Sequence, residues 1–548
     1  MASLVSGIQA QYIDLQEQYF ILRQSLAPLN LTGWQLARLL LAQVWRDIPT
    51  SAKLGLGLLV GVAILLAVDG FLVQPYFQSV RRLGIPRLWP SQGKHAWDYK
   101  PMLDEAAEKY PHNPWFFAYS GFEFVVFPSA YVDEIRRLPA RTASLVDFLT
   151  TVQFGGWRLI GSDDSSSTLH KTASTDLARS IAPLGLARQD TAKRAWEAAA
   201  GSSGAGKWAT ISLIWTVLDI VAKMGATGLV GEPLSRDKRW LTAVKVLPMT
   251  VGIGVISSSY FPRLLRPLVA TLSYFPAYLV YQYQSYLVRP TVEKAVRDFQ
   301  NNKKEDKKKT TFVQLIVQRY KPSELSVEQV IKDVITASFE STPTTAASLY
   351  WMLTELLIRP DLVEELRGEV VSVLDKNGRL PQTQLHELAK LDSFMRESAR
   401  VNTFHYLGLS RILREPVQLS IGPRLPKGTI VCVDQYHIHG SPDLYPDPDI
   451  FDAFRSYRLR HRPGQETLHQ YSSNGPELLT WGDGPQVCPG RVFAGNTIKI
   501  LLAHLLLDYD IQMPAGAAYK PERLSLPNGS VQPDLSVKFM IRRRKVSG

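Results

Sequence analysis

Cysteine is nearly absent from this sequence: its 548 residues include two, Cys432 and Cys488. This scarcity excludes a disulfide framework and a cysteine-rich zinc site, and it fits a reducing compartment. Internal repeats are not evident, and 45% of the residues are apolar, so most of the chain can form a packed core. The formal charge of +12 suggests an acidic partner or an anionic membrane surface. Because the sequence shows no nucleic-acid motif and its basic residues are scattered, we expect no nucleic-acid partner.

Charge is also scarce in one particular stretch. Residues 54–73 contain a single charged side chain, Asp69. About 20 apolar residues make roughly 30 Å of helix, the thickness of a bilayer core, so we predict a transmembrane anchor here, with a buried core helix as the alternative. Residues 1–53 form an N-terminal extension that is too long for a cleaved signal peptide. We expect this extension to be lumenal, and 34–48 to be an amphipathic or an ordinary packed helix.

The patterning that follows predicts one large body at 74–548. Residues 114–128 are typical of two short strands joined by a turn. Helical patterns dominate from about residue 170 to 400. Residues 422–434 predict a turn and then a strand, with Cys432 at a core position. The fold class that we predict is α+β, mainly α with smaller β-sheets.

A second uncharged stretch lies at 268–288. Pro276 and the many Tyr, Gln and Ser side chains make it a poor membrane span. We expect either a buried helix or a surface that dips into the membrane.

The second cysteine, Cys488, lies between a glycine-rich turn and a helical run, in "GDGPQVCPGRVFA". At the start of a helix, unpaired N–H groups and the helix dipole lower the pKa of a thiol and favour the thiolate. A nucleophile needs a base, and no histidine lies close in the sequence. One cysteine cannot build a zinc site, whereas a lone thiolate can be the axial ligand of haem iron. From these residues alone, a haem ligand and a buried structural cysteine both remain open.

This loop resembles the haem-binding loop of the cytochromes P-450, whose pattern is Phe-x-x-Gly-x-x-x-Cys-x-Gly. Trp481 stands in place of the phenylalanine, and Gly484, Cys488 and Gly490 take the other places. The resemblance implies a cytochrome P-450 fold and heme b with Cys488 as the axial ligand of its iron. The residue two before the cysteine is commonly Arg or His and contacts a haem propionate. Gln486 stands there, so that contact is neutral or lost.

Upstream residues match other parts of the family pattern. Glu397 and Arg400 form its Glu-x-x-Arg pair, one helical turn apart, although such a pair taken alone is ordinarily a surface ion pair. The resemblance links this pair to Arg455 as a structural core beside the haem. It also places Arg411 against a haem propionate, and His170 as a second propionate contact or a surface histidine.

The oxygen-activating helix of the family corresponds to 326–360, which we predict to begin with a capping box at Ser326. The family motif falls on residues 340 to 344. Thr344 is retained, Pro343 takes the place of the usual acid, and Glu340 takes the place of a small residue. Because proline lacks an N–H group, we expect the helix to open locally. The resemblance makes Thr344 a catalytic residue, and whether Glu340 or water replaces the acid stays open.

The likeness extends to filamentous-fungal members, in part through "GLVGEPLSRDKRWL" (228–241). It implies a haem-thiolate monooxygenase that uses dioxygen and NADPH-derived electrons to hydroxylate or otherwise oxidise an apolar secondary metabolite, which we expect to be a terpenoid or meroterpenoid. The implied partners are NADPH–cytochrome P-450 reductase, cytochrome b5 and the membrane. A slight excess of basic residues after the anchor predicts a single-pass protein of the endoplasmic reticulum with a cytosolic catalytic domain. Two alternatives are an isomerase or dehydratase on the same fold, and a haem-binding sensor without turnover.

Overall fold

The computed structural model describes most of the chain, namely residues 50–68, 80–89, 99–119, 122–154, 167–201, 206–259, 261, 265–301, 310–381, 385–515, 524–525 and 530–544. Its contacts divide the chain into two compact units, Met1–Pro75 and Tyr76–Gly548.

The described part of the first unit is a helix, α3 (Thr50–Val68). Its last 15 residues, 54–68, carry no charge and include large exposed apolar side chains, among them Leu54, Leu58, Leu59, Val60 and Ile64. The end of the predicted anchor, 69–73, and the expected helix at 34–48 lie outside the described residues.

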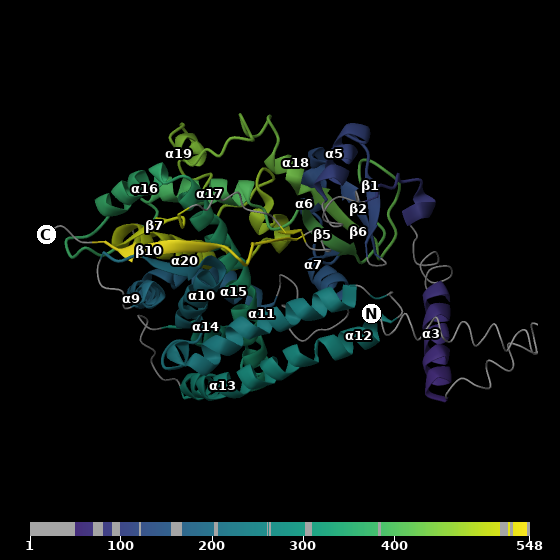
Figure 1. Ribbon diagram of the computed structural model, residues 1–548, viewed down its shortest axis with the longest axis horizontal. Coiled ribbons are helices and arrows are strands. Elements are labelled where there is room, and N and C mark those ends of the chain that lie inside the picture. The colour runs from purple at the N-terminus through teal and green to yellow at the C-terminus, as the bar shows by residue number, and fades with distance from the viewer. Residues whose placement is uncertain are drawn as a thin grey trace, which may run out of the picture. The chain divides into compact units, whose positions relative to one another are not determined.

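The second unit is mainly helical, which confirms the predicted fold class (Figure 1). Its α-helices are α5 (Lys100–Lys109), α6 (Val132–Arg136), α7 (Leu145–Phe148), α8 (Thr168–Lys171), α9 (Ile181–Ala200), α10 (Leu213–Leu229), α11 (Lys238–Ser259), α12 (Arg266–Ser273), α13 (Phe275–Gln300), α14 (Phe312–Arg319), α15 (Val327–Ile358), α16 (Asp361–Ser372), α17 (Ala389–Val401), α18 (Gln435–His439), α19 (Arg455–Arg460) and α20 (Arg491–Asp508).

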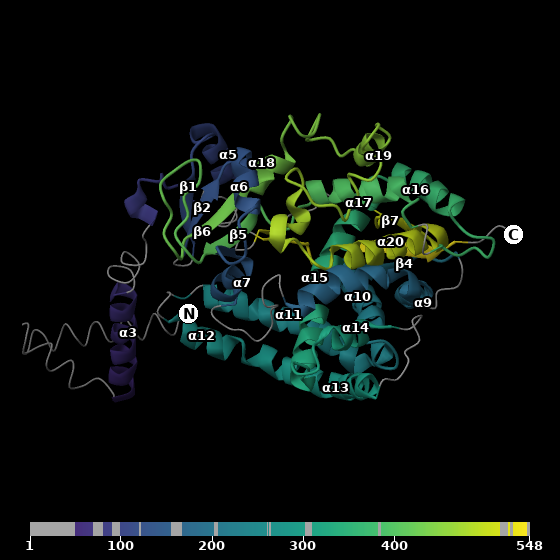
Figure 2. The same ribbon diagram turned by 180° about the vertical axis from the view of Figure 1, so that it is seen from behind.

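The largest sheet has five strands in the order β1-β2-β6-β5-β3 and lies at one end of this unit, beside α5, α6 and α18 (Figures 1 and 2). β1 and β2 pair antiparallel, which confirms the hairpin predicted at 114–128. β6 runs parallel to β2 and places Cys432 opposite Val126, so the predicted core position of Cys432 is also confirmed. The five strands are β1 (Trp115–Tyr119), β2 (Phe122–Phe127), β3 (Ala143–Ser144), β5 (Leu407–Leu413) and β6 (Ile430–Asp434).

The remaining described strands form two smaller sheets. One has the order β4-β10-β7 and the other pairs β8 with β9. Their strands are β4 (Ala209–Ser212), β7 (Tyr509–Gln512), β8 (Leu524–Ser525), β9 (Val531–Gln532) and β10 (Lys538–Arg543).

Helix α15 passes through the core and confirms the long helix predicted from the sequence. Its 32 residues span about 48 Å. The predicted capping box at Ser326 is wrong, because the Ser326 side chain makes no capping hydrogen bond. The Gln329 amide instead donates to Asp333 Oδ1, one turn further along, at 3.0 Å.

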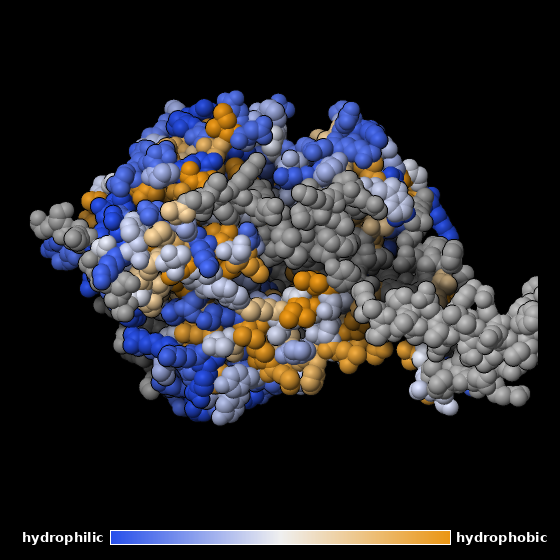
Figure 3. All heavy atoms as spheres, viewed as in Figure 1, coloured by the Kyte–Doolittle hydropathy of each residue, from blue (hydrophilic) through white to orange (hydrophobic). Residues whose placement is uncertain are grey.

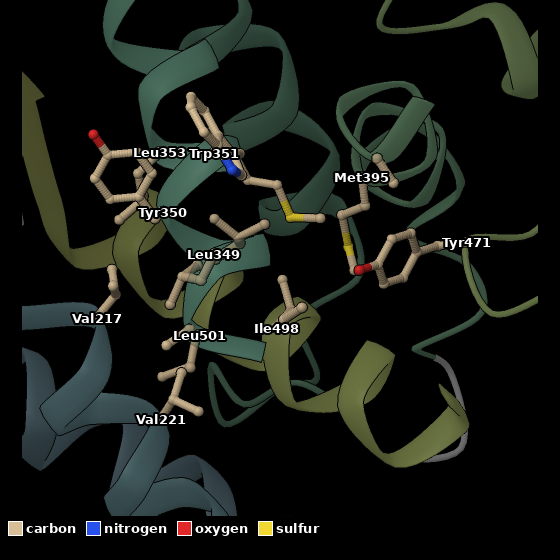
Figure 4. Close-up of a cluster of buried hydrophobic side chains, with 14 of the residues drawn as sticks. Val217, Val221, Leu349, Tyr350, Trp351, Leu353, Met395, Tyr471, Ile498 and Leu501 are labelled. Atoms are coloured by element: carbon tan, nitrogen blue, oxygen red, sulfur yellow. The ribbon is translucent and has the colours of Figure 1, made fainter. Parts of the chain in front are cut away.

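The main core lies where α15 meets α10, α17 and α20 (Figure 4). Its side chains are buried and come from segments far apart in the sequence, among them Val217, Val221, Leu349, Tyr350, Trp351, Leu353, Met395, Tyr471, Ile498 and Leu501. This packing holds α15 against α20, the helix that follows the cysteine loop.

The stretch at 268–288 forms α12 and the first half of α13, at the surface of the unit. Apolar side chains gather over α11, α12 and α13 along the lower edge in Figure 3. The exposed ones include Ile253, Ile256, Leu268, Leu272, Phe275, Tyr278, Leu279, Tyr283 and Tyr286. The stretch is therefore not a fully buried helix, and its contact with a membrane stays a prediction.

Among the described residues, one helix is long and apolar enough to cross a membrane, the stretch Lys238–Ser258 of α11. Its Trp240 and Leu247 are fully buried in a second hydrophobic core, which α11 forms with the neighbouring helices α10, α13, α14 and α15. Packing in the folded unit thus accounts for the apolar side chains on this face of α11.

Candidate active site

Cys488 lies in a tight loop that ends at the first residue of α20, Arg491. The backbone N–H of Cys488 donates to the carbonyl of Trp481 at 2.8 Å, which closes the loop. Gly484 has a φ of 70°, and a Cβ at this position would collide with the carbonyl oxygen of Arg136. Glycine is therefore required for the loop to approach the neighbouring backbone this closely.

The Cys488 thiol is held where ionisation is costly. Burial raises its pKa to about 11, although the backbone N–H groups of Gly490 and Arg491 oppose this shift. The negative charge of Glu340 raises the pKa further. The expectation that the helix start would lower this pKa is thus wrong, because burial outweighs the N–H groups. A metal cation at the sulfur would remove this cost, since a thiolate is the ligating form.

The side-chain amide of Gln486 makes two hydrogen bonds to the backbone of a neighbouring segment. Its Oε1 accepts from the N–H of Leu145 at 2.8 Å, and its Nε2 donates to the carbonyl of Ala143 at 2.9 Å. These bonds tie the loop to β3 and to the start of α7. The expectation that a propionate contact here is neutral or lost stays a prediction.

Asp483 is a residue of the loop that the sequence reasoning did not single out. It is 1% exposed, and its carboxylate accepts from Arg136 at 3.1 Å, from Asn474 at 2.5 Å and from its neighbour's backbone, Gly484 N, at 2.8 Å. A buried carboxylate with three donors is well satisfied and holds the loop in one conformation. In the sequence, the position of Asp483 between Gly482 and Gly484 could have indicated its role in the turn.

Glu397, Arg400 and Arg455 meet in the interior. Arg400 donates from Nε and Nη2 to the two carboxylate oxygens of Glu397, at 3.0 and 2.7 Å. The Nε of Arg455 lies 3.4 Å from Glu397 Oε2. All three residues are at most 9% exposed, which excludes the ordinary surface ion pair as the explanation of this Glu-x-x-Arg sequence.

His439 connects this cluster to the cysteine loop, and nothing in the sequence pointed to it. Its carbonyl accepts from Arg400 Nη1 at 2.8 Å, and its Nε2 accepts from the N–H of Leu479 at 3.2 Å. Burial and the neighbouring Arg400 charge lower the pKa of His439 to about 3, so the imidazole stays neutral and can accept. The link depends on tertiary packing, because the two segments are 40 residues apart.

The distal residues lie near the middle of α15. Thr344 Oγ1 donates to the carbonyl of Glu340 at 2.9 Å, and both residues are exposed. Thr342 is 2% exposed and donates to the carbonyl of Ser338 at 2.8 Å. The helix continues through Pro343 without interruption, so the opening that we expected is limited to the hydrogen bond that proline cannot make.

Comparison with known proteins decides the family. The family model described as cytochrome P450 matches residues 236–539. A cytochrome P450 monooxygenase of Aspergillus flavipes, ffsD, is 39% identical over 539 residues, which cover 97% of this chain and 99% of that protein. The chain belongs to the cytochrome P450 family. The cytochrome P450 described here is therefore a monooxygenase.

Other relatives of this cytochrome P450 agree. The pyrichalasin C-18 hydroxylase of Pyricularia grisea is 36% identical over 542 residues, covering 96% of this chain and 98% of that protein. Among solved structures, the cyanobacterial CYP120A1 with bound retinoic acid shares the fold, with a TM-score of 0.60 and 14% identity over 80% of this chain and 93% of that chain.

The cytochrome P450 family implies haem with thiolate ligation, and the residues present fit this group. Of the two cysteines, Cys432 is fully buried inside the sheet and Cys488 is partly accessible. Arg411 on β5 is 3% exposed, and among the described residues no carboxylate lies within ion-pair distance of it. Burial lowers the pKa of Arg411 to about 10. A buried cation without an anion suits the carboxylate of a bound group, such as a haem propionate.

His170 lies on α8 and is half-buried. Its backbone N–H donates to Ser167 Oγ at 3.1 Å, which caps the helix. Its contact with a propionate remains a prediction.

Proposed function

We propose that this cytochrome P450 hydroxylates an apolar fungal secondary metabolite at a haem whose iron is bound by Cys488. The observation that supports it most is the combination of a partly accessible cysteine before α20 with the buried Arg411, which has no carboxylate partner among the described residues. Haem bound in this way activates dioxygen. The surrounding protein makes the thiol costly to ionise, so the iron itself would stabilise the thiolate there.

Each neighbouring residue then has a task that follows from its contacts. Arg411 donates to one haem propionate, and His170 serves as a second contact. Gln486 ties the loop to the backbone at Ala143 and Leu145, and any propionate contact from its amide would be a neutral one. Thr344 presents a hydroxyl from α15 and holds water near the reacting oxygen.

The loop glycines and the buried ion cluster position the ligand. Trp481 donates from its indole to the carbonyl of Tyr471 at 2.7 Å and is fixed against the loop. Gly490, two residues after the thiol, leaves open space where a Cβ would stand. Glu397, Arg400 and Arg455 hold the segment that leads to the loop through His439.

Two observations support attachment to a membrane. Helix α3 is uncharged over 54–68 and carries exposed apolar side chains, as expected of a lipid-facing anchor. The exposed apolar side chains of α11 to α13 form a surface that is suited to lie against lipid. We propose a single-pass protein of the endoplasmic reticulum membrane, with residues 74–548 in the cytosol.

The relatives indicate which class of substrate to propose. One of them hydroxylates pyrichalasin, so we propose hydroxylation at carbon of a pyrichalasin-like metabolite, beside the terpenoid or meroterpenoid predicted from the sequence. We propose that electrons come from NADPH through cytochrome P-450 reductase, with cytochrome b5 as a second donor.

The test is product formation in membranes that contain this protein and a reductase. Candidate metabolites of both classes are supplied, and products are identified by mass spectrometry. We expect a product heavier by one oxygen atom that requires both NADPH and reductase. A product of unchanged mass without NADPH would instead indicate an isomerase, and loss of water a dehydratase. Haem binding without any product would indicate a sensor.

A further inference from the structure

One face of α15 combines a carboxylate with two hydroxyls. Glu340, Thr344 and Ser348 follow one another at four-residue intervals and so lie on the same face of the helix. Glu340 and Thr344 are exposed, whereas Thr342, which points another way, is 2% exposed. The hydroxyl of Thr344 donates to the Glu340 carbonyl at 2.9 Å, which joins the first two members.

This face is turned toward the loop of Cys488. Ser348 lines a small pocket together with Ala399, whose carbonyl accepts from the Thr480 hydroxyl at 3.5 Å, directly before Trp481. The ring of Tyr471 packs edge-on against Trp481, with 5.3 Å between the ring centroids. Trp481 in turn accepts the hydrogen bond from the Cys488 N–H.

Charge gives a second, independent indication of this orientation. The carboxylate of Glu340 is among the groups whose charge acts on the Cys488 thiol. A carboxylate on the opposite side of α15 would be separated from the thiol by the body of the helix. Glu340 therefore lies on the side of α15 that faces the loop of Cys488.

We propose that Glu340 is the proton-donating carboxyl of this monooxygenase, in place of the acid that Pro343 removes from the family motif. This inference rests on the proposed function. Hydroxylation of one C–H bond consumes one dioxygen, two electrons and two protons. One oxygen atom enters the product, the other leaves as water, and the redox partner supplies both electrons. Each proton passes from the Glu340 carboxyl toward oxygen, and solvent reprotonates the carboxylate because the residue is exposed.

The experiment compares Glu340→Gln and Glu340→Asp with the parent, all in the haem-loaded, full-length protein. Glu328→Gln is the matched control, since Glu328 is an exposed acid on the same helix and pairs with Arg289 at 2.8 Å. We expect Glu340→Gln to lower the rate of product formation roughly 100-fold and to divert electrons into hydrogen peroxide. Glu340→Asp should recover part of the coupling, and Glu328→Gln should behave as the parent.

A measurement without turnover completes the test. In the reduced carbon monoxide complex, the infrared C–O stretching band reports charges and donors near the bound gas. We expect this band to shift in Glu340→Gln and to stay in place in Glu328→Gln. Parental coupling in Glu340→Gln, or an unshifted band, would overturn the role of Glu340. The proposed function fails separately, if the parent lacks the thiolate signature or forms no oxygenated product.

Discussion

Arg400 donates two hydrogen bonds to Glu397, at 3.0 and 2.7 Å. Arg400 is 4% exposed and Glu397 is 3% exposed. The same arginine donates to the carbonyl of His439, whose ring accepts from the backbone before the cysteine loop. The buried ion pair is therefore linked through His439 to Leu479, in the segment that leads to the proposed haem ligand.

Breaking this pair should be costly. Glu397→Gln leaves the charges of Arg400 and Arg455 without their carboxylate, and removing one partner of a buried pair costs about 3–5 kcal/mol. We expect a matching loss in the free energy of unfolding, measured by denaturant titration, together with reduced haem incorporation. Glu105→Gln, which opens an exposed pair with Lys109 on α5, should leave both unchanged. Equal stability of Glu397→Gln and the parent would contradict the structural role.

The two cysteines allow a direct test of the haem ligand. Cys488→Ala should abolish the thiolate signature in the spectrum of the reduced carbon monoxide complex. Cys432→Ala should retain it, because Cys432 is buried inside the sheet, where its thiol lies 3.6 Å from the carbonyl of Val125. Circular dichroism checks that both variants are folded. A surviving signature in Cys488→Ala would assign the ligand elsewhere.

Thr344 and Thr342 form a matched pair on α15. Both hydroxyls donate to a carbonyl one turn earlier, but Thr344 is exposed and Thr342 is buried. We expect Thr344→Ala to bind haem and substrate normally and to release most of its reducing equivalents as peroxide. Thr342→Ala should do so much less. The measurement is product formed per NADPH consumed, and identical coupling in Thr344→Ala and the parent would remove this hydroxyl from the mechanism.

His437 makes the stability of the sheet end sensitive to pH. Burial lowers the pKa of His437, but Asp434, at 2.7 Å from Nδ1, and Asp104, at 3.3 Å from Nε2, outweigh it and raise the pKa above its ordinary value. A raised pKa in the folded state means that the stabilisation is fully present below about pH 6.5, the unfolded value, and is lost as pH rises through the folded value.

The melting temperature of His437→Gln should therefore fall below that of the parent at acidic pH, with the difference shrinking as pH rises through the folded value. Asp104→Asn, which removes one of the two acids, should show a smaller difference of the same form. A difference that is constant from acidic to basic pH would show that the imidazole acts by packing alone.

Local patterns in the sequence determined much of the fold. Alternating aromatic residues at 114–128 predict the β1–β2 hairpin, and the apolar periodicity before Pro360 predicts α15 to within two residues of its ends. The resemblance of the segment with Gly484, Cys488 and Gly490 to the cytochrome P450 pattern predicted the haem loop. At Gly484 the neighbouring backbone of Arg136 leaves no room for a side chain. Such features depend on neighbours within a few positions, and a sequence displays these neighbours directly.

Tertiary structure decided the electrostatics and the connections. The capping box at Ser326 failed because Gln329 found a partner in Asp333, and the thiol of Cys488 has a raised pKa because burial outweighs the helix start. The link through His439 and the burial of Arg411 without a carboxylate among the described residues have no signature in the sequence. Desolvation and contacts between distant segments exist only once the chain has packed, so these parts of the site could be read only from the folded protein.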